Sequence, residues 1–137
     1  MEFVHDLNPL IIFITAMSTY VVAGIWYSPG LFGKTWHRES RDTVPFSATH
    51  PFRVLAIGFA LALIPVITLS LVLGPHPTIV RATGLGFDIG FCFVATSFGI
   101  HYQFANLSLK LWLIDGGFRV VQFAVFGWLL GWLGRFG

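Results

Sequence analysis

Four long apolar segments restrict what this 137-residue chain can fold into more than any other feature. They cover about residues 9–27, 52–73, 79–104 and 107–133. A helix needs roughly 20 mostly apolar residues to cross a bilayer. Charged residues make up only 10% of the chain, against about 25% in soluble domains, so a soluble fold would expose large apolar patches. The sequence therefore predicts an all-α fold, an integral membrane bundle of four transmembrane helices forming a single domain, 1–137.

Lysine and arginine are divided unevenly between the two ends of this predicted bundle. The polar loop 28–51 and the turn before the last segment share one side, which holds Lys34, Arg38, Arg41, Arg53 and Lys110. The other side holds Arg81 and Arg135. Short loops rich in Lys and Arg stay in the cytoplasm. We therefore expect loop 28–51 to be cytoplasmic and both termini to be external.

The stretch "SPGLFGKTWHR" contains Gly-Lys-Thr, as a phosphate-binding loop does. That motif needs a glycine five residues before its second glycine, and Ser28 stands there instead. It also needs a strand before it and a helix after it to hold phosphates, whereas here a membrane segment precedes it. We therefore expect no nucleotide to bind, and the scarcity of basic residues argues against nucleic acid.

Aromatic and basic residues around this stretch suit the membrane–water boundary. Trp26, Tyr27 and Trp36 have the amphipathic rings that are favoured at headgroup depth, and Lys34 can extend toward lipid phosphates. The simpler interpretation is a helix end with four lipid-interface anchors. A sharper one is a lipid-headgroup site made by Lys34, His37 and Arg38.

Two stretches carry a resemblance to a known family. "GIWYSPGLFGKTW", with Trp26, Tyr27 and Lys34, and "LWLIDGGFRVVQFAVFGWLLGW", with the pair Asp115 and Gly116, resemble a bacterial family of small four-helix integral membrane proteins. That family is known only as a domain of unknown function. The resemblance covers most of the chain and implies four spans in a bacterial inner membrane. It implies no activity.

Ionisable residues inside the predicted spans are the first places to look for function, because they are costly in lipid. Asp115 and Arg119 lie four residues apart, so they share a helix face and can neutralise each other, and Gln122 continues that face. Asp88 lies on a stripe of small and polar residues, which we expect to face the bundle. Similar depths in the membrane would bring Asp88 to Arg119. Such an intramembrane polar network could handle protons or a small cation.

Glycines at helical spacing predict close helix packing. Gly127 and Gly131 form a small-xxx-small pair, Gly134 lies on roughly the same side, and Gly84 belongs to the stripe of Asp88. The pair lies on a different side of its helix from Asp115. We therefore expect one side to pack in the bundle and the other to contact a second subunit.

No set of residues predicts catalysis. The five histidines are scattered without metal-ligand spacing, and the single cysteine, Cys92, lies in apolar surroundings. We expect no catalytic residues, no metal and no cofactor. The favoured function is a non-catalytic accessory or packing subunit of a larger membrane assembly. The alternative is an oligomeric small channel or transporter that uses the Asp/Arg network. A lipid-modifying enzyme has least support, because no nucleophile and base pair can be named. The expected partners are the lipid bilayer and either further copies of the chain or other membrane subunits.

Overall fold

The computed structural model describes residues 7–40 and 51–135, and every regular element in these ranges is helical. The elements are α1 (Pro9–Trp26), α2 (Gly33–Glu39), α3 (Pro51–Leu73), α4 (Ile79–Ile89), the π-helical segment η3 (Gly90–Ala95), α5 (Thr96–Phe104) and α6 (Leu109–Leu133). Because α4, η3 and α5 are continuous, these two ranges contain four helices long and apolar enough to cross a membrane. The predicted all-α fold with four spans is confirmed.

Three of the spans begin at polar residues that cap the helix. The Asn8 side chain accepts hydrogen bonds from the N–H groups of Leu10 and Ile11. Thr78 caps α4 and Ser108 caps α6 in the same way, each through its hydroxyl oxygen. The first backbone N–H groups of a helix lack partners within it, and such caps satisfy part of them. The sequence therefore fixes where these spans start.

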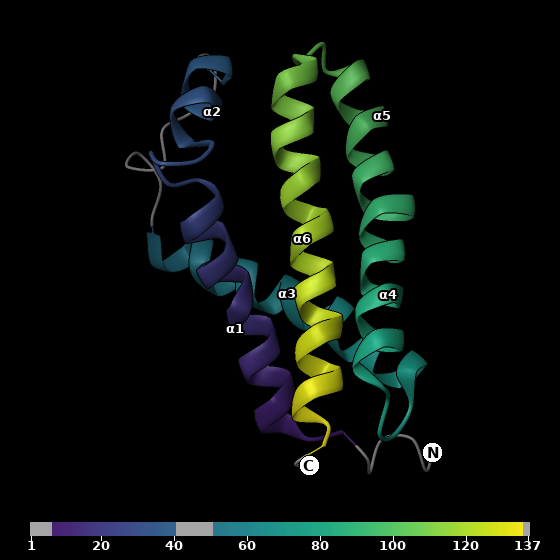
Figure 1. The fold of residues 1–137 in the computed structure, drawn as a ribbon. Helices are drawn as coiled ribbons and strands as arrows, with labels where there is room; N and C mark the ends of the chain where they lie inside the picture. Colours follow the sequence, from purple (N-terminus) through teal and green to yellow (C-terminus); the bar gives the residue numbers. More distant parts are fainter. Residues whose placement is uncertain (1–6, 41–50, 136–137) are drawn as a thin grey trace.

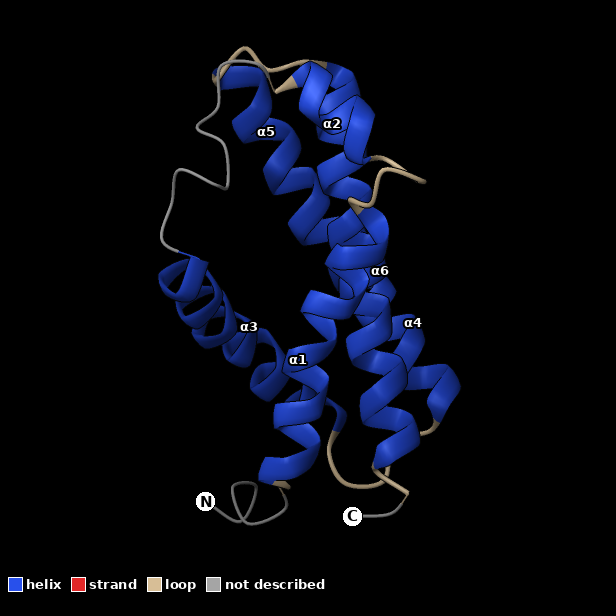
Figure 2. Ribbon diagram, turned by 90° about the vertical axis from the view of Figure 1, so that its left-hand side faces the viewer, coloured by secondary structure: helices blue, strands red, loops and turns tan. Residues whose placement is uncertain are grey.

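Three rods pack side by side, and the remaining span is inclined to them (Figure 1). The rod of α4, η3 and α5 lies next to α6 along its whole length, and α1 packs on another side of α6. Helix α3 crosses behind them at an angle, and its start leans away from the other spans (Figure 2). It contacts α1 through Leu55, whose carbonyl oxygen accepts a hydrogen bond from the Tyr20 hydroxyl, and through Phe59, whose ring packs on Phe13. The start of α1 and the end of α6 lie at one end of the molecule, and α2 lies at the other.

The apolar core lies in the half of the molecule where α1 begins and α6 ends. Its buried members are Ile12, Ala16, Ala62, Val66, Leu69, Leu73, Ala82, Phe126 and Leu130. Phe126 and Val66 are fully buried. The half that carries α2 lies outside this cluster, but it also buries apolar side chains of α6, namely Leu111, Ile114 and Phe118. Polar contacts add to this packing there.

Small residues allow α4 to pack directly on the backbone of α6. A Cβ atom added to Gly86 would lie 2.1 Å from the Phe123 carbonyl oxygen, and one added to Gly127 would lie 2.0 Å from the Ala82 carbonyl oxygen. Gly131 contacts the backbone of Ile79 in the same manner. The predicted packing glycines Gly127 and Gly131 thus contact α4 of the same chain, not a second subunit.

The other two predicted packing glycines differ. Gly134 follows the end of α6, where an added Cβ would meet the Leu130 carbonyl oxygen at 2.7 Å. Gly84 is exposed and has no atom within 4 Å of an added Cβ. Gly84 therefore packs on nothing among the described residues, and the expectation that its stripe faces the bundle is wrong.

The π-helical segment explains this error. The residues of the rod that face α6 are Ala82, Gly86, Gly90, Ala95 and Gly99, at intervals of four, four, five and four residues. A π-turn holds one more residue than an α-turn, so η3 shifts the phase of the helix between Gly90 and Ala95. An unbroken α-helical count places Ala95 and Gly99 in line with Asp88, whereas the structure places them in line with Gly86.

The polar loop 28–51 contains a short helix, α2, that the sequence did not lead us to expect. The chain turns back after Tyr27, and the N–H groups of Leu31 and Gly33 both donate to the Ser28 carbonyl oxygen at 3.0 Å. An added Cβ on Gly33 would lie 2.2 Å from the Tyr27 carbonyl oxygen. The glycine of the Gly-Lys-Thr stretch therefore serves a tight turn. Residues 41–50 lie outside the described part of the chain.

Candidate functional site

A carboxylate with two phenol partners joins three helices in the half of the molecule that lies outside the main apolar cluster. Asp115 lies near the start of α6. Its Oδ1 accepts a hydrogen bond from the Tyr27 hydroxyl, 2.6 Å away, and its Oδ2 accepts one from the Tyr102 hydroxyl. Tyr27 follows the end of α1, and Tyr102 lies in α5. Asp115 thereby links α1, α5 and α6, and each of its oxygens has a partner.

Burial and the neighbouring carboxylate act together on Tyr27. Removal from water disfavours a phenolate, and the negative charge of Asp115 disfavours it further, so both raise the pKa of Tyr27. The hydroxyl therefore keeps its proton at physiological pH and remains a donor to Asp115. The Tyr27 ring also packs against Phe118 and Trp36, with centroids 5.4 and 5.9 Å away.

One turn further along α6, Arg119 is held by a hydrogen bond and two aromatic rings. Its Nη1 donates to Gln122 Oε1 at 2.8 Å, and Gln122 Nε2 donates to Thr19 Oγ1 of α1 at 3.0 Å. The guanidinium carbon lies 5.2 Å from the ring centroid of Phe98 and 5.1 Å from that of Phe118. An aromatic face attracts a cation at such distances. The charge thus has polar and aromatic neighbours inside the protein.

The expected pair of Asp115 and Arg119 is arranged differently from a direct ion pair. Both side chains lie on the bundle side of α6, as their spacing predicts, but Asp115 takes its hydrogen bonds from tyrosines and Arg119 gives its own to Gln122. Gln122, buried to 4% exposure, connects this second group to α1. The structure therefore brings Asp115, Arg119 and Gln122 together as a chain of contacts along one face.

Two tryptophans complete the contacts between helices at this end. Trp26 donates its indole N–H to the Ile114 carbonyl oxygen and lies over Gly117, while Trp112 donates to the Ala95 carbonyl oxygen and lies over Gly99. The acceptor of Trp112 is the last residue of η3. Glycine at these positions leaves room for the indole rings, so the tryptophans add both packing and hydrogen bonds between the helices here.

The four predicted lipid-interface anchors do not all have the same surroundings. Trp26 and Tyr27 turn their polar atoms toward α6, which corrects the expectation that they serve the headgroup region. Lys34 is exposed. Trp36 packs against Tyr27 and His37, and its indole nitrogen is buried without a hydrogen-bond partner among the described residues. The sequence identified aromatic residues at a helix end, but it could not distinguish a lipid neighbour from a helix neighbour.

Asp88 does not join this network. It is exposed, and it lies on the side of α4 opposite Gly86 and Gly90, which face α6. Arg119 has Gln122 and two phenyl rings as neighbours instead. The expectation that Asp88 faces the bundle beside Arg119 is wrong, because the side of α4 that packs is set by the closest backbone approach. The carboxylate is left on the outer surface of a membrane-spanning helix.

Sequence reasoning missed Tyr102, Thr19, Trp112 and Phe98. A signal existed for Tyr102, because a hydroxyl inside an apolar span needs a polar partner, and Asp115 offers one. Nothing in the sequence identifies Phe98 as a neighbour of Arg119, because that contact joins two different helices, α5 and α6. The described residues contain no group of three His, Cys, Asp or Glu side chains arranged to hold a metal ion.

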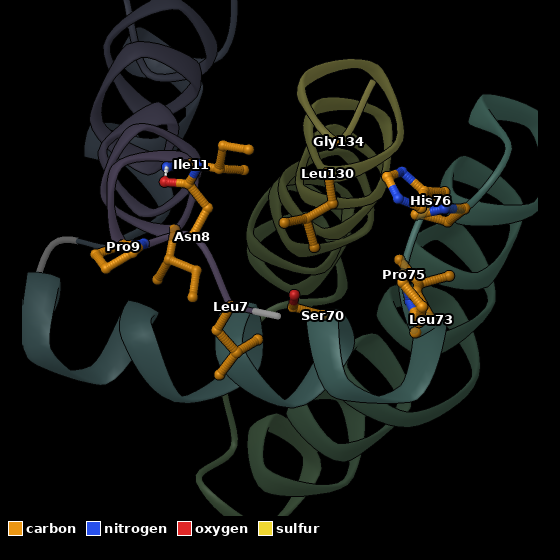
Figure 3. A pocket seen from close by; sticks show the side chains of 13 residues that line it. Leu7, Asn8, Pro9, Ile11, Ser70, Leu73, Pro75, His76, Leu130 and Gly134 are labelled. Carbon is orange, nitrogen blue, oxygen red and sulfur yellow. Dashed lines mark hydrogen bonds between the residues drawn. The ribbon is translucent and has the colours of Figure 1, made fainter. Parts of the chain in front are cut away.

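A cavity of about 490 Å³ lies at the opposite end of the molecule, away from this network. Figure 3 shows the side chains that line it. It is bounded by the start of α1, the turn between α3 and α4, and the end of α6. Its polar side chains are Asn8, Ser70 and His76, and that of Asn8 already caps α1. Among the described residues, no Asp, Glu, Lys or Arg side chain lines it.

Comparison with known proteins agrees with the resemblance found in the sequence. A family model described as "Protein of unknown function (DUF1761)" matches residues 10–131, a range that includes all four spans nearly whole. No curated protein and no solved structure matches the chain. The match covers the stretch from Trp26 to Trp36 as well as Asp115 and Arg119. The chain therefore belongs to the DUF1761 family, whose function is unknown.

Proposed function

We propose that this protein is a non-catalytic accessory subunit of a larger membrane assembly. The observation that supports the proposal is the position of Asp88. It is exposed on α4, nine residues after Ile79 and so about 13 Å along the helix, near the middle of a hydrocarbon core of about 30 Å. A charged residue there costs roughly 2.5–3.5 kcal/mol on insertion scales. A subunit interface that supplies a counter-charge would remove much of that cost.

The hydrogen-bonding pattern of the polar network around Asp115 also supports a non-catalytic role. Its carboxylate oxygens have tyrosine partners, and Arg119 and Gln122 are tied to the same bundle. Groups bound in this way stabilise the contacts between helices. The raised pKa of Tyr27 keeps its hydroxyl protonated, so Asp115 does not activate it as a nucleophile. We therefore assign the network a structural role and expect no enzymatic activity.

The alternative, an oligomeric channel or transporter, draws less support. It needs Asp88, Asp115 and Arg119 to act together, and Asp88 lies on the other side of α4. Within the network, transport would require the tyrosine hydroxyls to leave Asp115 during each cycle. A stable homo-oligomer with no other protein bound would favour this alternative over the accessory role.

The size of the protein after gentle extraction tests the accessory role. Tagged at its native locus and extracted in mild detergent, the 15.2 kDa chain is expected to elute in a complex with at least one other membrane protein. The same membranes solubilised in a harsh detergent serve as the control, because they should release the monomer. Elution as a monomer, or as copies of this chain alone, would contradict the proposal.

We also propose an orientation in a bacterial inner membrane, with both termini external and loop 28–51 cytoplasmic, on the basis of the unequal Lys and Arg counts. A reporter active only in the cytoplasm is expected to be silent when fused after Gly137 and active when inserted near Thr43. A periplasmic reporter at the same two sites should give the opposite pattern. Cytoplasmic activity at Gly137 would reverse the assignment.

A further inference from the structure

The surface of α4 around Asp88 differs in shape and in charge from the uniformly apolar surface that a helix presents to lipid. Arg81 and Gly84 lie on the same helix face as Asp88, at intervals of three and four residues. Gly84 has no atom within 4 Å of an added Cβ. The surface is therefore recessed beside the carboxylate, and another helix could come close enough to reach it.

Two phenylalanines form a ridge along one edge of this recess. Phe87 and Phe91 are 48% and 56% exposed, and their rings stack with centroids 6.0 Å apart and planes 1° from parallel. A recess at a glycine next to a ridge of aromatic rings forms an uneven surface into which the side chains of a packing helix can fit. Asp88 lies on this uneven surface, at mid-membrane depth.

A second copy of this chain does not supply the charge that Asp88 needs. In a symmetric dimer with its axis along the membrane normal, the two Asp88 carboxylates would lie at equal depth and repel each other. Among the described cations, Arg119 lies nearest that depth, and its guanidinium is held between Phe98 and Phe118 with a hydrogen bond to Gln122. A counter-charge at this depth is therefore expected from a different protein.

Building on the proposed accessory role, we infer that one face of α4 and η3 binds a transmembrane helix of another protein. This face is formed by Arg81, Gly84, Phe87, Asp88 and Phe91. That helix carries a lysine or arginine at mid-membrane depth, which pairs with Asp88. At that depth the dielectric constant is low, so the two opposite charges attract each other more strongly than they would in water. The pairing also sets the register of the two helices, because a basic residue at another depth would leave both charges unpaired.

Photo-crosslinking at defined positions tests this inference. Benzoylphenylalanine in place of Phe91 is expected to crosslink a foreign transmembrane segment that contains a Lys or Arg, identified by mass spectrometry of the crosslinked peptide. The matched control replaces Ile64, which is 62% exposed on α3, and should not give that product. Crosslinking only from Ile64 would overturn the inference while leaving the accessory role intact, whereas no foreign protein from either site would count against both.

Charge reversal then tests the pair itself. Asp88→Lys is expected to lower the yield of the Phe91-site crosslink about tenfold or more, and changing the partner's basic residue to Asp should restore it. Asp88→Asn should lower the yield less, because the amide can still accept a hydrogen bond. An unchanged yield in both variants would overturn the inference.

Cys92 gives an independent test on the same part of the helix. It is exposed and is the single cysteine of the chain. Oxidation of native membranes is expected to leave the chain without a disulfide-linked copy of itself. Efficient formation of a Cys92–Cys92 dimer would place a second copy on this face and overturn the inference.

Discussion

Gly127→Ala is expected to separate α4 from α6 and destabilise the protein by about 3 kcal/mol, at the upper end of the usual cost of overpacking. The added methyl group would lie 2.0 Å from the Ala82 carbonyl oxygen and 2.7 Å from its carbonyl carbon. Both atoms belong to the backbone, so no side chain can rotate away and the whole helix must move. The free energy of unfolding in mixed detergent micelles, followed by tryptophan fluorescence, measures the effect.

The chain offers two matched controls for this substitution. Gly84 on α4 and Gly24 on α1 have nothing within 4 Å of an added Cβ. Alanine favours a helix over glycine by about 1 kcal/mol in water, so Gly84→Ala and Gly24→Ala should leave the purified protein equally stable or more stable. Equal stability of Gly127→Ala and Gly84→Ala would show that the seam between α4 and α6 is not packed as described.

Asp115→Leu is expected to destabilise the protein by about 3 kcal/mol, because hydrogen bonds to a charged group contribute about 1.5–3 kcal/mol each. The substitution removes the acceptor of two hydroxyls, Tyr27 and Tyr102, and leaves both without a partner. These bonds join α1 and α5 to α6 outside the main apolar cluster. The same unfolding measurement detects the loss.

A double-mutant cycle separates the two tyrosine contacts from a general effect of losing charge. Tyr102→Phe and Asp115→Leu should be less than additive, because both remove the same bond. Asp88→Leu is the control: it removes a carboxylate that is exposed and has no hydrogen-bond partner among the described residues. The isolated protein should then be as stable as the wild type. If Asp88→Leu lowered the free energy of unfolding more than Asp115→Leu does, the assignment of the stabilising network to Asp115 would be contradicted.

The amino-acid sequence determined the class of the protein, the number of its spans and the residues at which three of them begin. Apolar length fixes the number of spans, because each backbone polar group in a bilayer must find its partner within a helix. Asn8, Thr78 and Ser108 determine where three spans start, because capping depends on residues close in sequence. The inward positions of Asp115, Arg119 and Gln122 also followed from their spacing on one helix.

Only the tertiary structure decided which side of the rod of α4 and α5 faces α6. That choice depends on the π-helical segment at Gly90–Ala95, which shifts the helix phase and has no reliable sequence signal. It also depends on how closely two backbones approach at Gly86 and Gly127, a property of two helices together. One shift of phase moved Asp88 from the expected interior to the outer surface, because neighbouring residues on an α-helix point about 100° apart.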